Sequence, residues 1–277
     1  MTPGPVHLAG DAWLVRLLPD AELLPGSGDA MRLHANAMVL TDGEPVLVDT
    51  GPPAARDDYW TQVESLLDPG DVRWIFLSHD DADHRGGLAD VLRRCPDATV
   101  VAGQALVHRL TATATVAVPP GRCRWVEDGD VLDVGGRALL AVRPPAYDLP
   151  TTRGLFDATS GVYWGADCFG TPVPAEIDDV ADLDDEVWVE GFTRHHLLLS
   201  PWISDVDPIR WRQAVGRVAM LGATTIASAH GPVIRGPHVG RALDLAFGLA
   251  GAPAPGGRRR PARDGGAGRH GTEVVRI

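Results

Sequence analysis

Short apolar segments alternate with polar segments rich in glycine and proline along most of the chain. Three apolar runs near the start, separated by Gly, Pro and Asp, predict antiparallel strands at residues 12–18, 36–40 and 45–49. Further along, short apolar runs predict strands and apolar residues at helical spacing predict helices. The expected order there is helix 59–67, strand 74–77, helix 87–95, strand 99–102 and helix 104–110.

The second half of the chain repeats this rhythm. Strands are expected at 124–126, 138–142, 154–156 and 162–164, and the last two would form a hairpin around 157–161. A helix at 208–221, with an apolar face of Ile209, Val215, Val218 and Met220, precedes a strand at 225–229. Beyond residue 250 the composition changes to Gly, Pro, Arg and Ala, which predicts a disordered tail at 251–277 behind a domain of residues 1–250.

Length and composition fit one large α/β domain. The chain has 277 residues, of which 44% are hydrophobic and 22% charged, and no apolar run reaches the roughly 18 residues that a membrane helix needs. The first residues lack a basic region followed by an apolar stretch, so the expected address is the cytoplasm. Three cysteines without Cys-x-x-Cys spacing predict reduced, mostly buried thiols.

The net charge of −12 argues against a nucleic-acid partner, because affinity for phosphates depends on Lys and Arg. A small-molecule substrate or a partner protein is expected instead, and the chain could form a homodimer. The acidic runs at 178–179 and 182–186 are typical of a solvated surface.

Four ionisable side chains follow the expected strand at 74–77, namely His79, Asp81, Asp83 and His84. On a tight loop, alternate side chains can turn inward together, so one short segment could bind two neighbouring cations. The alternative is a solvated acidic loop in which Asp83 caps the following helix.

This segment, Ser78-His79-Asp80-Asp81-Ala82-Asp83-His84, resembles the His-x-(His/Glu/Asp)-x-Asp-His signature of the metallo-β-lactamase superfamily. Val48-Asp49-Thr50-Gly51 resembles the strand-end motif that precedes the signature. Two later segments match in the expected order, around Asp167, where the family places a bridging Asp, and around His230, where it places a final His. The resemblance implies an αββα sandwich in which two mixed β-sheets are flanked by helices.

Within the superfamily the motifs are most similar to the di-iron domain of flavodiiron proteins and to stand-alone oxygen-binding di-iron proteins. Asp81 stands where that group commonly has a Glu, residues 165–170 resemble its bridging-Asp segment, and residues 194–196 resemble its Arg-Tyr-Tyr stretch. The resemblance implies one iron bound by His79, Asp81 and Asp148. It implies a second bound by Asp83, His84 and His230, with Asp167 bridging the two.

The chain departs from this pattern where the family has a His after the central strand. It reads Pro144-Pro145-Ala146-Tyr147-Asp148-Leu149-Pro150, and alignment of Asp148-Leu149-Pro150 with a family His-x-Pro places Asp148 at the ligand position, with Tyr147 as the fallback. Asp148 could instead be an ordinary turn residue. The residue at the His84 position turns away from the metal in some relatives. Tyr147, His195 and His196 are expected beside the ligands without binding metal, although the two histidines could simply pack or face solvent.

Two divalent cations would be nearly neutralised by Asp81, Asp83, Asp148 and Asp167. A neutral, carboxylate-rich site acidifies bound water less than a histidine-rich hydrolase site, and it favours iron over zinc, with manganese as a further alternative. The expected function is therefore binding or reduction of oxygen or a related diatomic molecule. No flavin motif is present, so either a separate protein would deliver electrons or the chain would bind oxygen without rapid turnover. A metal-dependent hydrolase of an ester, thioester, lactone or phosphoester, and a degenerate binding module with one metal or none, stay open as alternatives.

Overall fold

The computed structural model describes residues 4–17, 31–113, 116–174 and 176–250. Its first sheet has seven strands in chain order, β1 to β7. The first four strands pair antiparallel, and β4, β5, β6 and β7 run parallel to one another. The strands are β1 (Val6–Ala9), β2 (Ala12–Val15), β3 (Ala37–Leu40), β4 (Val46–Val48), β5 (Trp74–Phe76), β6 (Thr99–Ala102) and β7 (Cys123–Trp125).

The second sheet has six strands in the order β13-β12-β11-β10-β9-β8. Only β11 and β12 pair parallel, so this sheet is also mixed. Its strands are β8 (Val131–Asp133), β9 (Ala138–Val142), β10 (Gly154–Asp157), β11 (Val162–Trp164), β12 (Thr225–Ala227) and β13 (Ile234–Arg235).

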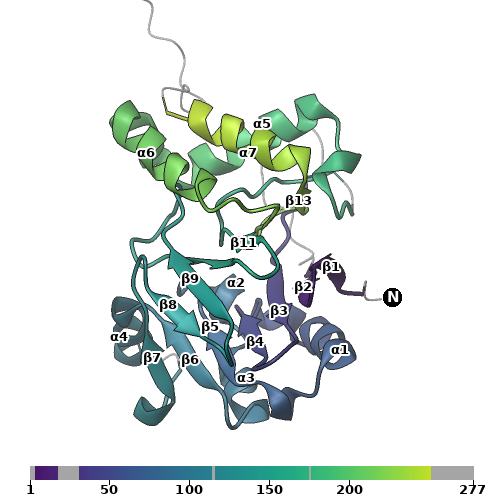
Figure 1. Cartoon of the computed structure of the whole chain (residues 1–277), viewed down its shortest axis with the longest axis vertical. Helices are drawn as coiled ribbons and strands as arrows, with labels where there is room; N and C mark the ends of the chain where they lie inside the picture. The colour runs from purple at the N-terminus through teal and green to yellow at the C-terminus, as the bar shows by residue number, and fades with distance from the viewer. Residues whose placement is uncertain (1–3, 18–30, 114–115, 175, 251–277) are drawn as a thin grey trace, which may run out of the picture.

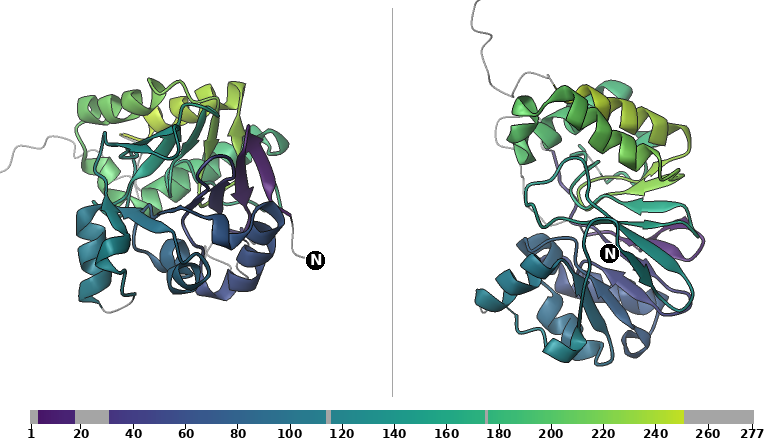
Figure 2. Two further views of the ribbon diagram at one scale, coloured as in Figure 1. Left: turned by 60° about the horizontal axis from the view of Figure 1, so that its bottom comes forward. Right: turned by 60° about the vertical axis from the view of Figure 1, so that its left-hand side comes forward.

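Helices cover the outer face of each sheet, so the molecule has four layers (Figures 1 and 2). The first sheet carries α1 (Arg56–Leu66), α3 (Leu88–Arg94) and α4 (Gln104–Ala112), and the second carries α5 (Asp185–Leu199), α6 (Pro208–Ala219) and α7 (Pro237–Gly248). The short helix α2 (Ala82–Arg85) follows β5. This arrangement confirms the expected αββα sandwich. Short 3-10 segments lie at Pro53–Ala55, Pro69–Asp71, Pro120–Arg122, Val180–Asp182 and Pro201–Asp205.

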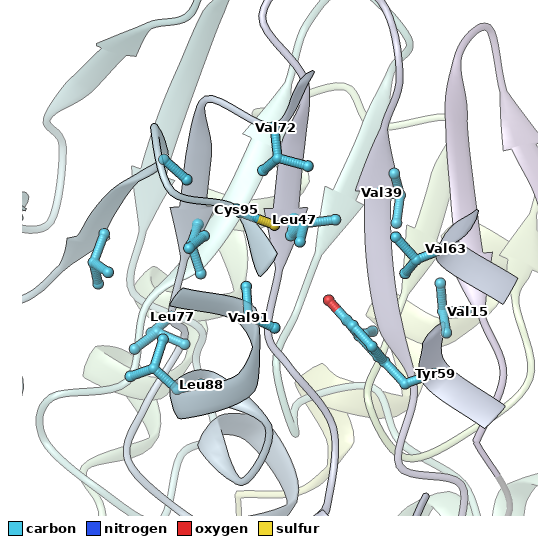
Figure 3. Packing of buried hydrophobic residues seen from close by; sticks show 14 of the residues in the cluster. Val15, Val39, Leu47, Tyr59, Val63, Val72, Leu77, Leu88, Val91 and Cys95 are labelled. Carbon is cyan, nitrogen blue, oxygen red and sulfur yellow. The ribbon is translucent and has the colours of Figure 1, made fainter. Parts of the chain in front are cut away.

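The central strands are apolar throughout because they are buried on both faces. Leu47 and Ile75 pack against α1 and α3, whereas Val48 and Phe76 point into the layer between the two sheets. Figure 3 shows the first of these contacts, where Leu47 lies close to residues of α1 and α3. Since β4 and β5 are parallel and adjacent, the residues that follow them reach the same edge of the sheet.

The structure adds helices and strands that the sequence pattern did not predict, namely β1, β8, β13, α2, α5 and α7. Helix α5 was missed because it begins in the acidic run read as surface. The predicted apolar face of α6 was partly wrong. Trp211 is buried there, whereas Ile209 and Met220 are 65% and 80% exposed. The tail predicted at 251–277 lies outside the described residues. Among the described helices, none combines the length and apolar character of a membrane span.

Candidate metal centre

Asp49, directly after β4, organises the loop that follows β5. Its carboxylate accepts hydrogen bonds from the backbone N–H and the hydroxyl of Ser78, at 2.8 and 2.7 Å, and lies 2.9 Å from Nδ1 of His84. Asp49 is fully buried and has a positive φ of 61°, a strained conformation for a residue with a side chain. The carboxylate therefore ties the ends of two strands together and orients one imidazole.

His79 and His84 both direct Nε2 toward the site. The Ser78 hydroxyl lies 3.1 Å from Nδ1 of each, and the two ring centroids are 3.8 Å apart. The Nε2 atoms of both rings are buried and make no hydrogen bond of good geometry, although oxygens of the Asp167 carboxylate lie 3.4 Å from Nε2 of His79 and 2.9 Å from Nε2 of His84. A buried polar atom without such a bond is costly, so the two Nε2 atoms are suited to a ligand that the protein does not itself supply.

Asp167 lies in a tight turn after β11, between Ala166 and Phe169, which both have positive φ. Its two oxygens face different histidines. Oδ2 lies 3.4 Å from Nε2 of His79, while Oδ1 lies 2.9 Å from Nε2 of His84 and 3.2 Å from Nε2 of His230. With one oxygen on each side, this carboxylate has the geometry of a bridge between two cations.

His230 follows β12, and a hydrogen bond on the side of the ring away from the site fixes its orientation. Its Nδ1 lies 2.7 Å from the backbone carbonyl of His34, which leaves Nε2 to face the site, 3.4 Å from Asp83. The side chain of Asn36 donates to the carbonyls of Ser228 and Gly231 on either side of this histidine. Residues that precede β3 thus set the position of a ligand candidate nearly two hundred positions later in the chain.

Two further carboxylates, Asp81 and Asp148, meet on the other side of His79. Ligand atoms of these three residues lie within 4.8 Å of one another. Partial burial and the neighbouring carboxyl of Asp148 raise the pKa of Asp81. Asp148 also accepts a hydrogen bond from the backbone N–H of Leu149 at 2.7 Å, as a turn residue does. The turn and ligand interpretations are therefore compatible, because one carboxylate has oxygens for both.

Charges at the centre favour ionised Asp167, which is the form that binds metal, and protonated His84, whose proton a metal ion would displace. Burial alone would raise the pKa of Asp167, but the imidazoles of His79, His84 and His230 lower it well below the usual value. Burial would lower the pKa of His84, and the carboxylates of Asp167 and Asp49 instead raise it well above normal. Asp167 is therefore ionised at neutral pH, and the imidazoles and carboxylates compensate one another's charge.

His195 and His196 of α5 contact the turn that carries Asp167. Nε2 of His195 donates to the backbone carbonyl of Asp167 at 3.0 Å, and Nε2 of His196 accepts from the backbone N–H of Phe169 at 2.9 Å. Burial lowers the pKa of His195 to about 3 and that of His196 to about 4, so both are neutral. Neither imidazole is among the candidate ligands. Tyr147 lies further out and accepts hydrogen bonds at its carbonyl from Ser200 and Trp202.

The structure brings every expected ligand into one place. Among the described residues, three overlapping groups could each bind a metal ion, and the ligand atoms within a group lie within 4.8 Å of one another. The shared members His79 and His84, together with Asp167, join the groups into one centre of two positions. The buried atoms Nε2 of His79, Nε2 of His84 and Oδ1 of Asp167 lie close together without hydrogen bonds of good geometry, and this arrangement fits a pair of cations. The groups are His79, His84 and Asp167; Asp83, His84 and His230; and His79, Asp81 and Asp148.

Sequence reasoning placed His195 and His196 beside the ligands but missed the groups that orient the imidazoles of His84 and His230. Asp49 was noted only as part of a motif, and the contact of His34 is made by its backbone carbonyl, which no side-chain pattern reveals. A close approach also explains Gly170, where an added Cβ would lie 2.4 Å from Nε2 of His195. Cys168 is buried, as expected, and burial raises its pKa to about 12.

Comparison with known proteins identifies the family. The model of the metallo-beta-lactamase superfamily matches residues 30–199, and the chain belongs to that superfamily. It is 25% identical over 209 residues to putative diflavin flavoprotein A 1 of Nostoc sp., which covers 72% of this chain and 33% of the relative. It is also 25% identical over 208 residues to the anaerobic nitric oxide reductase flavorubredoxin of Salmonella arizonae, which covers 72% of this chain and 41% of the relative.

Solved structures share the fold. Rubredoxin oxygen:oxidoreductase from Desulfovibrio gigas superposes with a TM-score of 0.75 at 16% identity, covering 88% of this chain and 60% of that one. The flavodiiron protein from Giardia intestinalis gives 0.71 at 16% identity, covering 88% and 59%. The expected resemblance to the flavodiiron group is thereby confirmed. This chain spans only about a third to two fifths of the length of the curated relatives named above.

Proposed function

We propose that this protein binds two iron ions and is an oxidoreductase that binds or reduces oxygen or a related diatomic molecule. The observation that carries the proposal is the placement of Asp167, whose two oxygens face opposite halves of a cluster of three histidines and three further aspartates. Relatives named as a nitric oxide reductase and as an oxygen oxidoreductase support this choice of reaction class.

His79, Asp81 and Asp148 would bind the first ion, and Asp83, His84 and His230 the second, with Asp167 between them. Iron in this position supplies reversible one-electron redox chemistry, which hard carboxylate ligands support by stabilising the trivalent state. The carboxylate-rich first position favours iron over zinc and a redox reaction over hydrolysis.

The protein's own residues prepare this centre. Asp49 and the carbonyl of His34 orient the imidazoles of His84 and His230 from behind, which keeps each Nε2 directed at the site. His195 and His196 hold the turn of Asp167 through backbone hydrogen bonds. Because these supports are buried, the histidine side of the centre is closed to bulk water, and only Asp81, Asp83 and Asp148 reach the surface.

The proposed reaction also needs an electron donor, and we propose an electron-transfer protein as that partner. The metal identity and the partner are both part of the proposal.

Metal analysis with visible and redox spectroscopy tests it. The full chain, purified without oxygen, should contain about two irons. After chemical reduction it should be reoxidised by oxygen or nitric oxide in a way that Asp167→Ala abolishes. Two zinc ions per chain with ester or phosphoester turnover would overturn the proposal in favour of a hydrolase, and a metal-free chain of normal stability would favour a binding module.

A further inference from the structure

A pocket of about 330 Å3 lies beside the loop that carries Asp148, on the side of α6. Three aromatic side chains line it, Tyr147, Trp202 and Trp211. Trp211 is buried and donates its Nε1–H to the carbonyl of Ala246, so this wall is anchored in the core. A pocket of this volume, with rigid aromatic walls, fits a planar molecule of the size of a nucleotide.

Three guanidinium groups line the same pocket, those of Arg143, Arg210 and Arg217. None of them takes part in an ion pair within the described part of the chain, although most other described arginines do. Acidic residues outnumber basic ones by twelve in this protein, so a group of unpaired arginines is unexpected. Such a group attracts an anion from outside the protein.

Arg143 has a hydrogen-bond donor that no other described residue uses. Its Nε is buried and has no hydrogen-bond partner, and its guanidinium lies 6.0 Å from the centroid of the Tyr147 ring. The cation therefore lies close to an aromatic face, within cation–π range, and retains an unused donor.

Arg210 and Arg217 are seven residues apart on α6, which places them on the same helix face, with Gln213 and Ala214 between them. Both are exposed, so each can move toward a bound ligand at little cost. The anionic group of a bound ligand would contact these two mobile guanidinium groups at the rim of the pocket. The ring of the same ligand would contact the aromatic walls.

We propose that this pocket binds a planar aromatic molecule that carries a carboxylate or phosphate group. The site is separate from the metal centre, but Tyr147 connects them. It lines this pocket and also a small cavity beside Asp167 and His195. A ligand here would contact the segment that carries Asp148 without contacting the metal ligands.

The test uses 2-naphthoate as the probe, with 2-naphthamide as the neutral molecule of the same shape and acetate as the anion without a ring. Binding to the full metal-containing chain is measured by ligand-observed NMR. We expect 2-naphthoate to bind with a Kd of about 1 mM or tighter, given the affinity per atom of small ligands, and to bind at least about fivefold more tightly than either control compound.

Variants locate the binding. Arg210→Ala and Arg217→Ala should each weaken binding about fivefold, and the double variant by tenfold or more. Arg212→Ala is the matched control, because Arg212 is exposed on the same helix but does not line the pocket. Equal binding of 2-naphthoate and 2-naphthamide would overturn the proposal. So would unchanged affinity in the double variant, which would place any binding at the metal centre or elsewhere.

Discussion

The two halves of the candidate metal centre are built in opposite ways. In the histidine-rich half, His84 and His230 are buried, and each is oriented by a hydrogen bond that its Nδ1–H donates, to the carboxylate of Asp49 and to the carbonyl of His34. In the carboxylate-rich half, Asp81 is exposed and Asp148 half-buried, and they come from two separate loops.

This difference predicts that the two halves differ in metal affinity and in access for a small molecule. Preorganised ligands lose little conformational entropy on binding, so the histidine-rich half should bind its metal ion more tightly. We expect the carboxylate-rich half to be the more open side, where a small molecule can enter and where the ligand charge favours iron. Asp167, which faces both halves, couples them.

Asp167→Ala should have the largest effect, because it removes the one carboxylate that both halves share. We expect metal content to fall from about two ions per chain to less than about half an ion. Elemental analysis of the purified variant measures this. Asp182→Ala, which removes an exposed carboxylate elsewhere, is the control. Full metal content in Asp167→Ala would show that the halves are independent.

Asp49→Asn should weaken the histidine-rich half selectively. The amide keeps the size of the side chain but loses the charge that orients His84, and we expect the tighter of the two metal affinities to fall about 10- to 100-fold. A chelator competition titration resolves the two affinities. Asp90→Asn alters a partly buried carboxylate bonded to Trp60, away from the centre, and should change neither. If the weaker affinity fell instead, the assignment of the halves would be wrong.

Changes at Asp148 should affect the weaker position more modestly. Asp148→Asn should lower its affinity for iron about tenfold, since one anionic ligand is lost. Asp148→His should restore a more usual ligand set and raise the zinc-to-iron ratio, because the site becomes more positive. Iron and zinc are measured in wild type and both variants after identical purification. Equal stoichiometry in all three would make Asp148 a turn residue alone.

A substitution far from the metal centre should change the metal affinity of neither half. Arg137 bridges Asp11, in the β1–β2 turn, and Asp157, at the end of β10. Arg137→Met should lower the free energy of unfolding by about 2 kcal/mol at pH 7, because it leaves two carboxylates without their partner. Metal content should be unchanged.

The pH dependence of that loss has a defined sign. Both carboxyl groups are partly buried, which would raise their pKa values, but hydrogen bonds and charge attraction from Arg137 lower both pKa values below the usual range of an aspartate. Their stabilisation is therefore present above about pH 4 and is lost as the pH falls through the lowered values. Urea unfolding of wild type and Arg137→Met at several pH values should show the difference shrink below pH 4. A constant difference would mean that Arg137 acts through packing.

Much of the molecule could be predicted from the sequence by itself. The apolar strands before Asp49 and before His79 and the spacing from His79 to His84 are local features, so the strand-end loops and the candidate ligands were identified without a structure. The motifs around Asp167 and His230 follow in the order found in the metallo-β-lactamase superfamily, and this resemblance implied both the superfamily and the fold class.

Tertiary structure alone decided how these ligand candidates are supported and which of them meet. No local pattern places the carbonyl of His34 behind His230, or directs His195 and His196 to the turn of Asp167, because these contacts join residues that are distant in sequence. The inward position of His84 likewise depends on Asp49, 35 residues earlier. Hydrogen bonds across such separations form only when both sheets and α5 have packed, and for that reason the direction of a side chain, unlike its identity, is a property of the whole fold.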